Sequence, residues 1–452
     1  MDLQFLGGTG TVSGSKYLLR SGLHQILIDC GLFQGYKQLR LRNWAPLPVD
    51  PHTLDGVILT HAHIDHSGYL PLLVRNGFSG KIWCTRATLE LCRVLLPDSA
   101  RLQEEEAEYA NRRGFSKHKP ALPLYTEADA QRCLKHFSPI DYRRDIDLGQ
   151  GVIAQLLPAG HLLGAAMVKV HGPQGSVLFS GDLGRPNDVV MKPPVTREEA
   201  NYLVLESTYG NRSHPDEDPS TKLADVITRT VKRKGVVIIP SFAVGRAQAL
   251  LYLIARLHAA GRIPDVPVFL NSPMAVDATA IYRNHPDEHR LSAAECGWLS
   301  ENATFVRGIE ESKALNARRG PMVIIAGSGM ATGGRVVHHL KAFAGNPRTS
   351  ILFTGYQAGG TRGASIMAGA DKIKIHGAYI PVRAEVAMLD SLSAHADADE
   401  ILGWLKTIAS SPRKTFIVHG EPLAADALRL RIAEELGWDV MVPEHMERVK
   451  LA

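Results

Sequence analysis

Four potential metal ligands lie within six residues near the start of the chain, in the run His61-Ala62-His63-Ile64-Asp65-His66. The apolar residues 56–59 before them predict a short buried strand, and residues 67–74 after them predict the start of a helix. The ligands would therefore lie on the loop that leaves the strand's carboxyl end. His61 and His63 can reach one metal there, and Asp65 and His66 can face a second position. Histidines also gather in surface patches, but this spacing after a buried strand favours a metal site. Imidazole-rich sites suit zinc, and zinc with an open position for water is catalytic.

Length and composition set the broad class of protein. A chain of 452 residues predicts two or three domains. A hydrophobic content of 45% with 21% charged residues is typical of soluble globular proteins. The chain has no long apolar run, and its first residues lack the basic end and apolar stretch of a signal peptide, so we expect a cytoplasmic protein without a membrane partner.

The cysteines and the net charge narrow the class further. Five cysteines, with no Cys-x-x-Cys pair, argue against a disulfide framework and against a cysteine zinc site. The net charge of +5 permits a polyanionic substrate without requiring one.

Further metal-ligand residue types stand at the ends of other predicted strands. His161 follows residues 151–157, Asp182 ends the strand-like run 176–182, and His419 follows residues 415–418. His161 can complete the first metal's ligands, His419 the second's, and Asp182 can bridge both. Asp29 ends the apolar piece 25–28, where its carboxylate could orient a metal-bound histidine or cap a turn.

The segment between Asp182 and His419 is far longer than one crossover needs, so it must contain a folded insertion. Residues 209–377 repeat a strand–loop–helix pattern, which predicts a parallel sheet with ligands bound beyond its carboxyl ends. One of these loops, residues 327–335, is rich in glycine. Its backbone N–H groups could bind a phosphate at a helix start, or the loop could be a tight structural turn.

These motifs make the chain resemble the β-CASP nuclease branch of the metallo-β-lactamase fold, over nearly its whole length. The matching residues are Asp29 (motif 1), His61, His63, Asp65 and His66 (motif 2), His161 (motif 3), Asp182 (motif 4), Glu206 (motif A), His395 (motif B) and His419 (motif C). The resemblance implies an α/β protein, with a metallo-β-lactamase αββα sandwich formed by residues 1–208 and 378–452. Residues 209–377 would be the inserted β-CASP α/β domain, which carries a mostly parallel sheet and forms one wall of the substrate cleft.

The resemblance also implies an activity. The protein would be a zinc-dependent ribonuclease that hydrolyses phosphodiester bonds of single-stranded RNA, and a homodimer is compatible with it. Two zinc ions per chain would share a hydroxide, because metal binding lowers the pKa of the parent water to about 7. The implied metal ligands are His61, His63, Asp65, His66, His161, Asp182 and His419, with Asp29 behind them. Asp65, Glu206 and His395 would be catalytic, with His395 as the proton donor and Glu206 as its support.

The inserted domain would bind the RNA phosphates. The residues expected to do so are Ser241, Arg246, Ser328, Gly329, Gly333, Gly334 and Arg335. The histidine at motif C favours RNA over DNA, because the DNA-repair branch of the family carries an aliphatic residue there.

Three other interpretations compete with a ribonuclease. A thioester, lactone or β-lactam hydrolase of the same fold would use the cluster at residues 61–66, but it would have no use for the insertion, Glu206 or His395. A non-catalytic scaffold would have lost ligands, whereas all seven are present here. A nuclease of the same family that prefers DNA is the third, and only the histidine at motif C speaks against it. Within the ribonuclease interpretation, His395 itself could be a structural histidine at a helix start.

Overall fold

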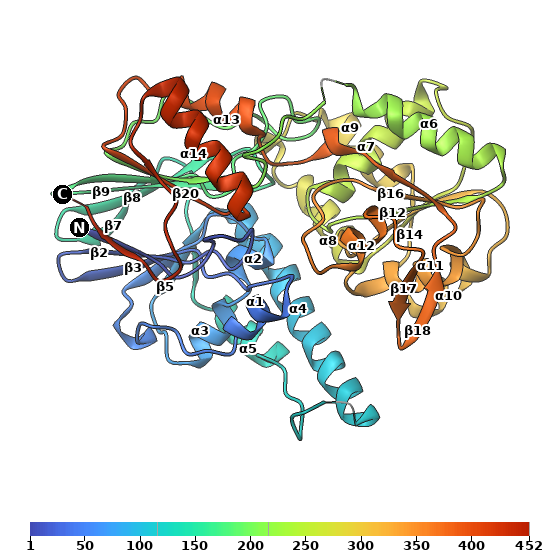
Figure 1. The fold of residues 1–452 in the computed structure, drawn as a ribbon, viewed down its shortest axis with the longest axis horizontal. Helices are drawn as coiled ribbons and strands as arrows, with labels where there is room; N and C mark the ends of the chain where they lie inside the picture. The colour runs from blue at the N-terminus through green and yellow to red at the C-terminus, as the bar shows by residue number, and fades with distance from the viewer. Residues whose placement is uncertain (115, 216, 452) are drawn as a thin grey trace. The chain divides into compact units, whose positions relative to one another are not determined.

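The computed structural model describes residues 1–114, 116–215 and 217–451, which form two compact units (Figure 1). The first unit comprises Met1–Asn187, Pro193–Ser213 and His395–Ala452. The second comprises Asp188–Lys192 and His214–Ala394.

Two seven-stranded sheets build the first unit. One has the order β22 (Arg448–Lys450), β1 (Asp2–Phe5), β2 (Tyr17–Ser21), β3 (His24–Ile28), β4 (Gly56–Ile58), β5 (Lys81–Cys84), β6 (Phe137–Pro139). The other has the order β21 (Val440–Met441), β20 (Lys414–Val418), β11 (Tyr202–Glu206), β10 (Gly175–Phe179), β9 (Ala166–Gly172), β8 (Val152–Pro158), β7 (Ile146–Gly149). Both sheets are mixed: β3, β4, β5 and β6 are parallel to one another, and so are β10, β11, β20 and β21.

The core of the first unit lies between the two sheets. Phe5 and Phe416, one from each sheet, have ring centroids 5.3 Å apart, and the rings of Tyr17 and Phe179 stack at 6.1 Å. The apolar residues of β8 and β9 alternate so that one side of each strand enters this core, as expected for strands covered mainly on one face.

Helices cover the outer faces of the sandwich. They are α2 (Ile64–Ser67), α3 (Leu70–Arg75), α4 (Arg86–Arg113), α5 (Glu127–Leu134), α13 (Ala398–Leu405) and α14 (Pro422–Leu436), with the 3-10 turn η1 (Pro51–Thr53). The short helix α1 (Lys37–Arg42) also belongs to this unit, but none of its residues is buried. In Figure 1, α13 and α14 lie on one side of the two sheets, and α2 to α5 lie on the other. The first unit is therefore an αββα sandwich, which confirms the predicted fold class.

The second unit is built on a six-stranded sheet in which every neighbouring pair is parallel. Its order is β14 (Thr304–Phe305), β13 (Val268–Asn271), β15 (Met322–Ala326), β12 (Val236–Pro240), β16 (Ser350–Phe353), β19 (Glu385–Met388). The central strands are buried throughout and read as continuous apolar runs, as parallel strands covered on both faces do. The predicted parallel sheet is confirmed.

Helices connect these strands, and a small hairpin packs beside them. The helices are α6 (Pro219–Lys232), α7 (Arg246–Ala259), α8 (Pro273–Tyr282), α9 (Ala293–Glu301), α10 (Ile309–Ala317), α11 (Gly334–Phe343) and α12 (Arg362–Met367), with η2 (Pro286–Glu288) and η3 (Asp390–Leu392). The hairpin consists of β17 (Lys372–Ile375) and β18 (Ala378–Pro381). Figure 1 shows α6 and α7 on one side of the six-stranded sheet and α10 and α11 on the other.

The second unit extends beyond the segment 209–377 expected from the sequence. The reason is strand pairing: β18 pairs with β17, and β19 pairs in parallel with β16 and becomes the edge strand of the six-stranded sheet. Residues 378–394 therefore belong to the second unit, and the chain returns to the first at His395. No helix among the described residues is both long enough and apolar enough to span a membrane.

Candidate metal centre

The predicted ligands gather at one edge of the sandwich in the first unit. His61 and His63 follow β4, His161 follows β8, Asp182 follows β10, and His419 follows β20. Since β10, β11 and β20 are parallel to one another, their carboxyl ends meet at the same edge. The fold thus brings together side chains that are hundreds of residues apart in the sequence.

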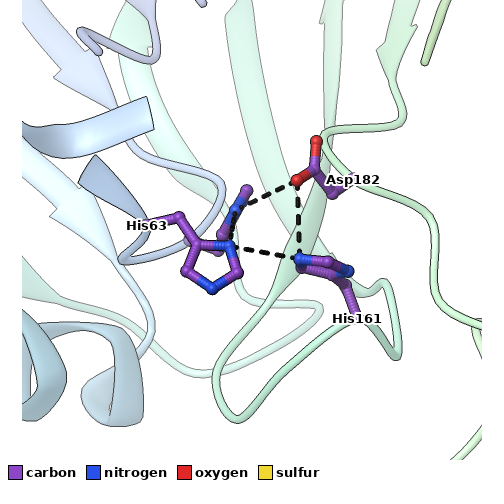
Figure 2. Close-up of side chains that lie close together, drawn as sticks. His63, His161 and Asp182 are labelled. Carbon is purple, nitrogen blue, oxygen red and sulfur yellow. Dashed lines mark hydrogen bonds and ion pairs between the residues drawn. The ribbon is translucent and has the colours of Figure 1, made fainter. Parts of the chain in front are cut away.

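A first cluster consists of His61, His63, His161 and Asp182. The Nδ1 atom of His63 lies 3.1 Å from His61 Nε2 and 3.2 Å from His161 Nε2. The Oδ2 atom of Asp182 lies 3.3 Å from His61 Nε2 and 3.4 Å from His161 Nε2. Figure 2 shows His63, His161 and Asp182 pointing towards one another. All four ligand atoms lie within 4.8 Å of one another, a spacing at which they could hold one metal ion.

A second cluster consists of Asp65, His66 and His419, and it shares Asp182 with the first. The Oδ1 atom of Asp182 lies 3.2 Å from His66 Nε2 and 3.5 Å from His419 Nε2. Asp65 Oδ2 lies 4.0 Å from His66 Nε2 and 3.9 Å from His419 Nε2. The two oxygens of Asp182 therefore face different clusters, which is the arrangement a carboxylate needs to bridge two metal ions.

The residues of the centre fit a bound cation. Although His66 Nε2 and Asp182 Oδ1 are buried and close together, neither makes a hydrogen bond with the described residues, so both keep a lone-pair or proton site directed at the common centre. Burial lowers the pKa values of His63 and His161 well below the usual histidine range, which favours the neutral, metal-binding form. Burial alone would raise the pKa of Asp182, but the surrounding histidines hold it well below its usual value.

A layer of hydrogen bonds behind the clusters fixes the orientation of three rings. Asp29 accepts from the backbone N–H and hydroxyl of Thr60 and lies 2.7 Å from Nδ1 of His66. The Thr60 hydroxyl is 3.0 Å from His61 Nδ1, and the Ser15 hydroxyl is 2.8 Å from His419 Nδ1. In each case the outer ring nitrogen is engaged and Nε2 is directed inwards.

Sequence reasoning named Asp29 but missed Thr60 and Ser15. Thr60 directly precedes the histidine motif, and a hydroxyl beside a metal motif was the only sequence signal for it. No sequence signal placed Ser15 near His419.

His395 and Glu206 form a third group next to Asp182. The Nδ1 atom of His395 lies 3.0 and 3.2 Å from the two carboxylate oxygens of Glu206, and 3.9 Å from Asp182 Oδ2. Glu206 is fully buried and also accepts the backbone N–H groups of Leu183 and Thr208. Burial alone would lower the pKa of His395, but Glu206 and Asp182 outweigh it and raise the value to about 9.

The glycine loop of the second unit lies at the carboxyl end of β15. Two of its glycines are required by close packing. A Cβ at Gly329 would lie 2.6 Å from the Phe242 ring, and Gly334 has a positive φ of 66° with a Cβ position only 2.8 Å from a backbone oxygen. Ser328 lies at the loop's surface with its hydroxyl 3.1 Å from that of Thr332.

The other expected phosphate-binding residues of the second unit lie around this loop. Ser241 follows β12, the neighbour of β15, and donates its backbone N–H to Ala326. Arg246 begins α7 near Gly355. Arg335, in contrast, directs its guanidinium into the fold, where it donates to Asn271 Oδ1 at 2.6 Å, to the carbonyl of Val306 at 3.0 Å and to that of Arg307.

Three family models match the chain in succession. The metallo-beta-lactamase superfamily matches residues 9–225, the Beta-Casp domain residues 247–366, and the Zn-dependent metallo-hydrolase RNA specificity domain residues 379–443. A relative from Thermus thermophilus, named Ribonuclease TTHA0252, is 38% identical over 92% of each chain. The chain belongs to the β-CASP branch of the metallo-β-lactamase superfamily. This confirms the resemblance seen in the motifs.

Proteins from two other organisms are also similar over nearly the whole chain. A protein of Methanosarcina mazei named Transcription termination factor FttA is 32% identical over 99% of this chain and 71% of its own length. The crystal structure of a protein of unknown function from Enterococcus faecalis V583 shares the fold, with a TM-score of 0.53, 13% identity and 99% coverage of both chains. The metallo-beta-lactamase match contains the first cluster, and the RNA specificity match contains His395 and His419.

Proposed function

We propose that the protein is a metal-dependent ribonuclease that hydrolyses phosphodiester bonds of single-stranded RNA. The observation that carries this proposal is the position of Asp182. One of its oxygens faces the first cluster and the other faces the second, and the His395–Glu206 pair lies directly beside it. Two adjacent cation sites with a positioned proton donor suit the hydrolysis of a phosphate diester.

We propose zinc as the metal, at two ions per chain. His61, His63, His161 and Asp182 would hold one ion, and Asp65, His66, His419 and Asp182 the other. Nitrogen-rich ligand sets with few carboxylates suit zinc better than magnesium or calcium. Zinc supplies two things when bound: a lower pKa for a coordinated water and a positive charge that offsets the charge of the phosphate.

His395 would act as the proton donor. Glu206 accepts from Nδ1 and thereby fixes the ring, so the proton on Nε2 is the one that His395 can deliver to the leaving oxygen. The backbone N–H groups of Leu183 and Thr208 donate to Glu206 and hold its carboxylate in place beside the ring. Asp65 would contribute to catalysis as a ligand that positions the second ion.

RNA is the substrate that the comparisons favour. The matched RNA specificity domain covers the segment that contains His395 and His419, and the similar protein from Thermus thermophilus is named a ribonuclease. Ser241, Arg246 and Ser328 of the second unit would bind phosphates, together with the backbone of the glycine loop. We also propose a cytoplasmic location, where the five free, buried cysteines would remain reduced.

End-labelled single-stranded RNA and DNA of matched sequence, each with a 5′-hydroxyl or a 5′-phosphate, would test the proposal. The zinc-loaded protein should cut RNA, should lose activity on dialysis against a chelator and should regain it with zinc. Asp182→Asn is the matched control, because it keeps the side-chain shape but weakens both sites. Equal cutting of DNA would redirect the proposal to a nuclease without sugar preference, and RNA cutting by Asp182→Asn would remove the metal centre from the mechanism.

A further inference from the structure

The first unit carries an exposed aromatic and basic segment that the proposed chemistry does not use. It comprises residues 34–44 and contains α1, labelled in Figure 1. Tyr36, Leu41 and Trp44 are exposed to 56%, 56% and 57%, an unusual density of large apolar side chains at a surface. We call residues 34–44 the α1 segment.

The α1 segment is held at its base and leads directly from the metal centre. Cys30 donates its backbone N–H to the carbonyl of His66, and Leu32 donates to that of Ile64, so the chain entering the segment is bonded to the helix that carries two proposed ligands. At the other end, the buried side chain of Asn43 accepts from the backbone N–H of Phe33 and donates to its carbonyl. The residues between these points therefore form a surface loop whose two ends are fixed by hydrogen bonds.

The helix within this loop, α1, has no buried residue. None of the six residues of α1 is buried, although short helices in proteins are normally held by an apolar face packed on the core. Lys37, Arg40 and Arg42 are exposed and make no ion pair with any described residue, and residues 30–49 contain no acidic side chain. The surface therefore combines two exposed aromatic rings with three positive charges that form no ion pair with the described residues, although the Arg42 guanidinium lies 5.4 Å from the centroid of the Phe33 ring.

We infer that the α1 segment binds the single-stranded RNA that extends from the metal centre. This inference rests on the proposed ribonuclease function. Tyr36 and Trp44 would stack on bases, and Lys37 and Arg40 would contact phosphates, the combination by which single strands are bound without regard to sequence. Single-stranded RNA matches the α1 segment in two ways: its phosphates complement the positive charges, and its unpaired bases can stack on the aromatic side chains.

Two double variants of the zinc-loaded protein test the inference with a fluorescein-labelled, 24-nucleotide single-stranded RNA carrying phosphorothioate linkages. Binding is followed by fluorescence anisotropy over a range of KCl concentrations. Tyr36→Ala with Trp44→Ala should raise the Kd by at least about fivefold, the effect of losing one stacked base. Lys37→Ala with Arg40→Ala should reduce the slope of log Kd against log salt by about 1.4, which corresponds to two lost phosphate contacts on a single strand.

Three measurements separate this inference from its rivals. Hydrolysis of bis(p-nitrophenyl) phosphate, which has neither stacked bases nor flanking phosphates for the α1 segment to bind, should be unchanged in both variants. Tyr109→Ala, which removes another partly exposed ring of the same unit, should keep the wild-type Kd. Wild-type RNA cleavage with unchanged Kd values in both double variants would overturn the inference and leave the proposed function standing.

Two further outcomes would also overturn the inference. A wild-type protein that neither binds nor cuts RNA would overturn it together with the proposed function. If light scattering shows that the double variants convert a dimer to a monomer while RNA affinity stays the same, the surface belongs to a second copy of the chain.

Discussion

At the scale of single residues, the centre depends on which nitrogen of a histidine ring is hydrogen-bonded and which one faces the cluster. Where Asp29, Thr60 or Ser15 engages the outer nitrogen, the inner one is presented to the cluster. The Nδ1 atom of His395 is likewise engaged, by Glu206, but the side chain of His395 is 19% exposed, whereas that of His419 is only 3% exposed. The two histidines should therefore respond differently to removal.

His395→Ala should retain metal and RNA affinity but cut RNA about 10²–10⁴-fold more slowly, the usual contribution of a positioned acid. The deficit should shrink on bis(p-nitrophenyl) phosphate, whose leaving group needs no proton. His419→Ala should instead lose metal and hydrolyse neither substrate well. Metal content by mass spectrometry and rates on both substrates would check this. If His395→Ala sheds metal, or is equally slow on the activated ester, His395 has a structural or metal-ordering role.

Lys16 gives the stability of the first unit a pH dependence. Its ammonium group is buried, lies 4.6 and 4.8 Å from the ring centroids of Phe33 and Tyr69, and donates to the carbonyl of Gly14 at 3.4 Å. Burial lowers the pKa of Lys16 to about 8, against about 10.4 in an unfolded chain. The unfolded chain thus binds more protons between these values, so this residue's destabilising effect is full below pH 8 and fades as pH rises towards about 10.4.

Lys16→Met should therefore raise the free energy of unfolding at pH 7, by up to about 3 kcal/mol, and the gain should fall towards zero near pH 10.4. Urea unfolding at pH 7, 9 and 10.4 would measure it. Lys81→Met, at an exposed position of β5, serves as the control and should show no such trend. A variant less stable than the wild type at pH 7 would mean that the two ring contacts outweigh the cost of burial.

The proposed metal ligands are easier to find in the sequence than the residues that hydrogen-bond to them. Histidines and carboxylates at strand ends are visible as a pattern, because few other roles place His61, His63 and His66 so close together. Ser15 is not visible in this way, since its contact with His419 joins residues near opposite ends of the chain. A serine in a glycine-rich turn is too common to indicate such a contact.

At the scale of elements, residues of the glycine loop differ in their roles. The Ser328 hydroxyl lies at the surface beside that of Thr332, but Arg335 ties the start of α11 to residues that follow or end β13 and β14. Its partner Asn271 also contacts Ser312 and His339, so the arginine belongs to a buried polar network. The sequence placed Arg335 at a helix start, yet it could not indicate which way the guanidinium points.

Arg335→Ala should therefore act on stability first. It leaves two carbonyl groups and the side-chain oxygen of Asn271 without their charged donor, at a cost of about 1–3 kcal/mol. Urea unfolding should show this loss, while the salt dependence of RNA binding stays as in the wild type. Ser328→Ala is the matched comparison and should weaken RNA binding with little effect on stability. A reduced salt slope in Arg335→Ala at wild-type stability would return the arginine to the phosphate-binding set.

Strand burial and pairing explain which strands of the second unit could be predicted from the sequence and which could not. The buried strands β12, β15 and β16 read as uninterrupted apolar runs, which made the parallel sheet predictable. The edge strand β19 is only partly buried throughout, so nothing in its own sequence assigns it to that sheet. Its pairing with β16 depends on tertiary structure, and this is why the second unit ends later than expected.

At the scale of the whole molecule, all the proposed metal ligands belong to the first unit, and the second unit has its own core. Four buried histidines and Asp182 converge on one centre, so a bound metal would offset the cost of burying these polar groups and should contribute to the stability of the first unit. A ligand at a thousandfold excess over its Kd stabilises the state that binds it by about 4 kcal/mol. That stabilisation should not extend to a sheet that supplies no ligand.

Metal removal should therefore loosen one unit and spare the other. In hydrogen–deuterium exchange, chelation should increase exchange in residues 59–66, 158–162 and 417–419, by up to about 10³-fold where opening is limited by metal binding. Peptides from β12 and β15 should be unaffected, and zinc should restore protection in the first unit. Asp182→Asn should exchange like the chelated protein before any chelator is added, which separates loss of metal from an effect of the chelator itself. Equal loosening of β12 and β15 would show that the two units unfold as one and that the metal stabilises the whole chain.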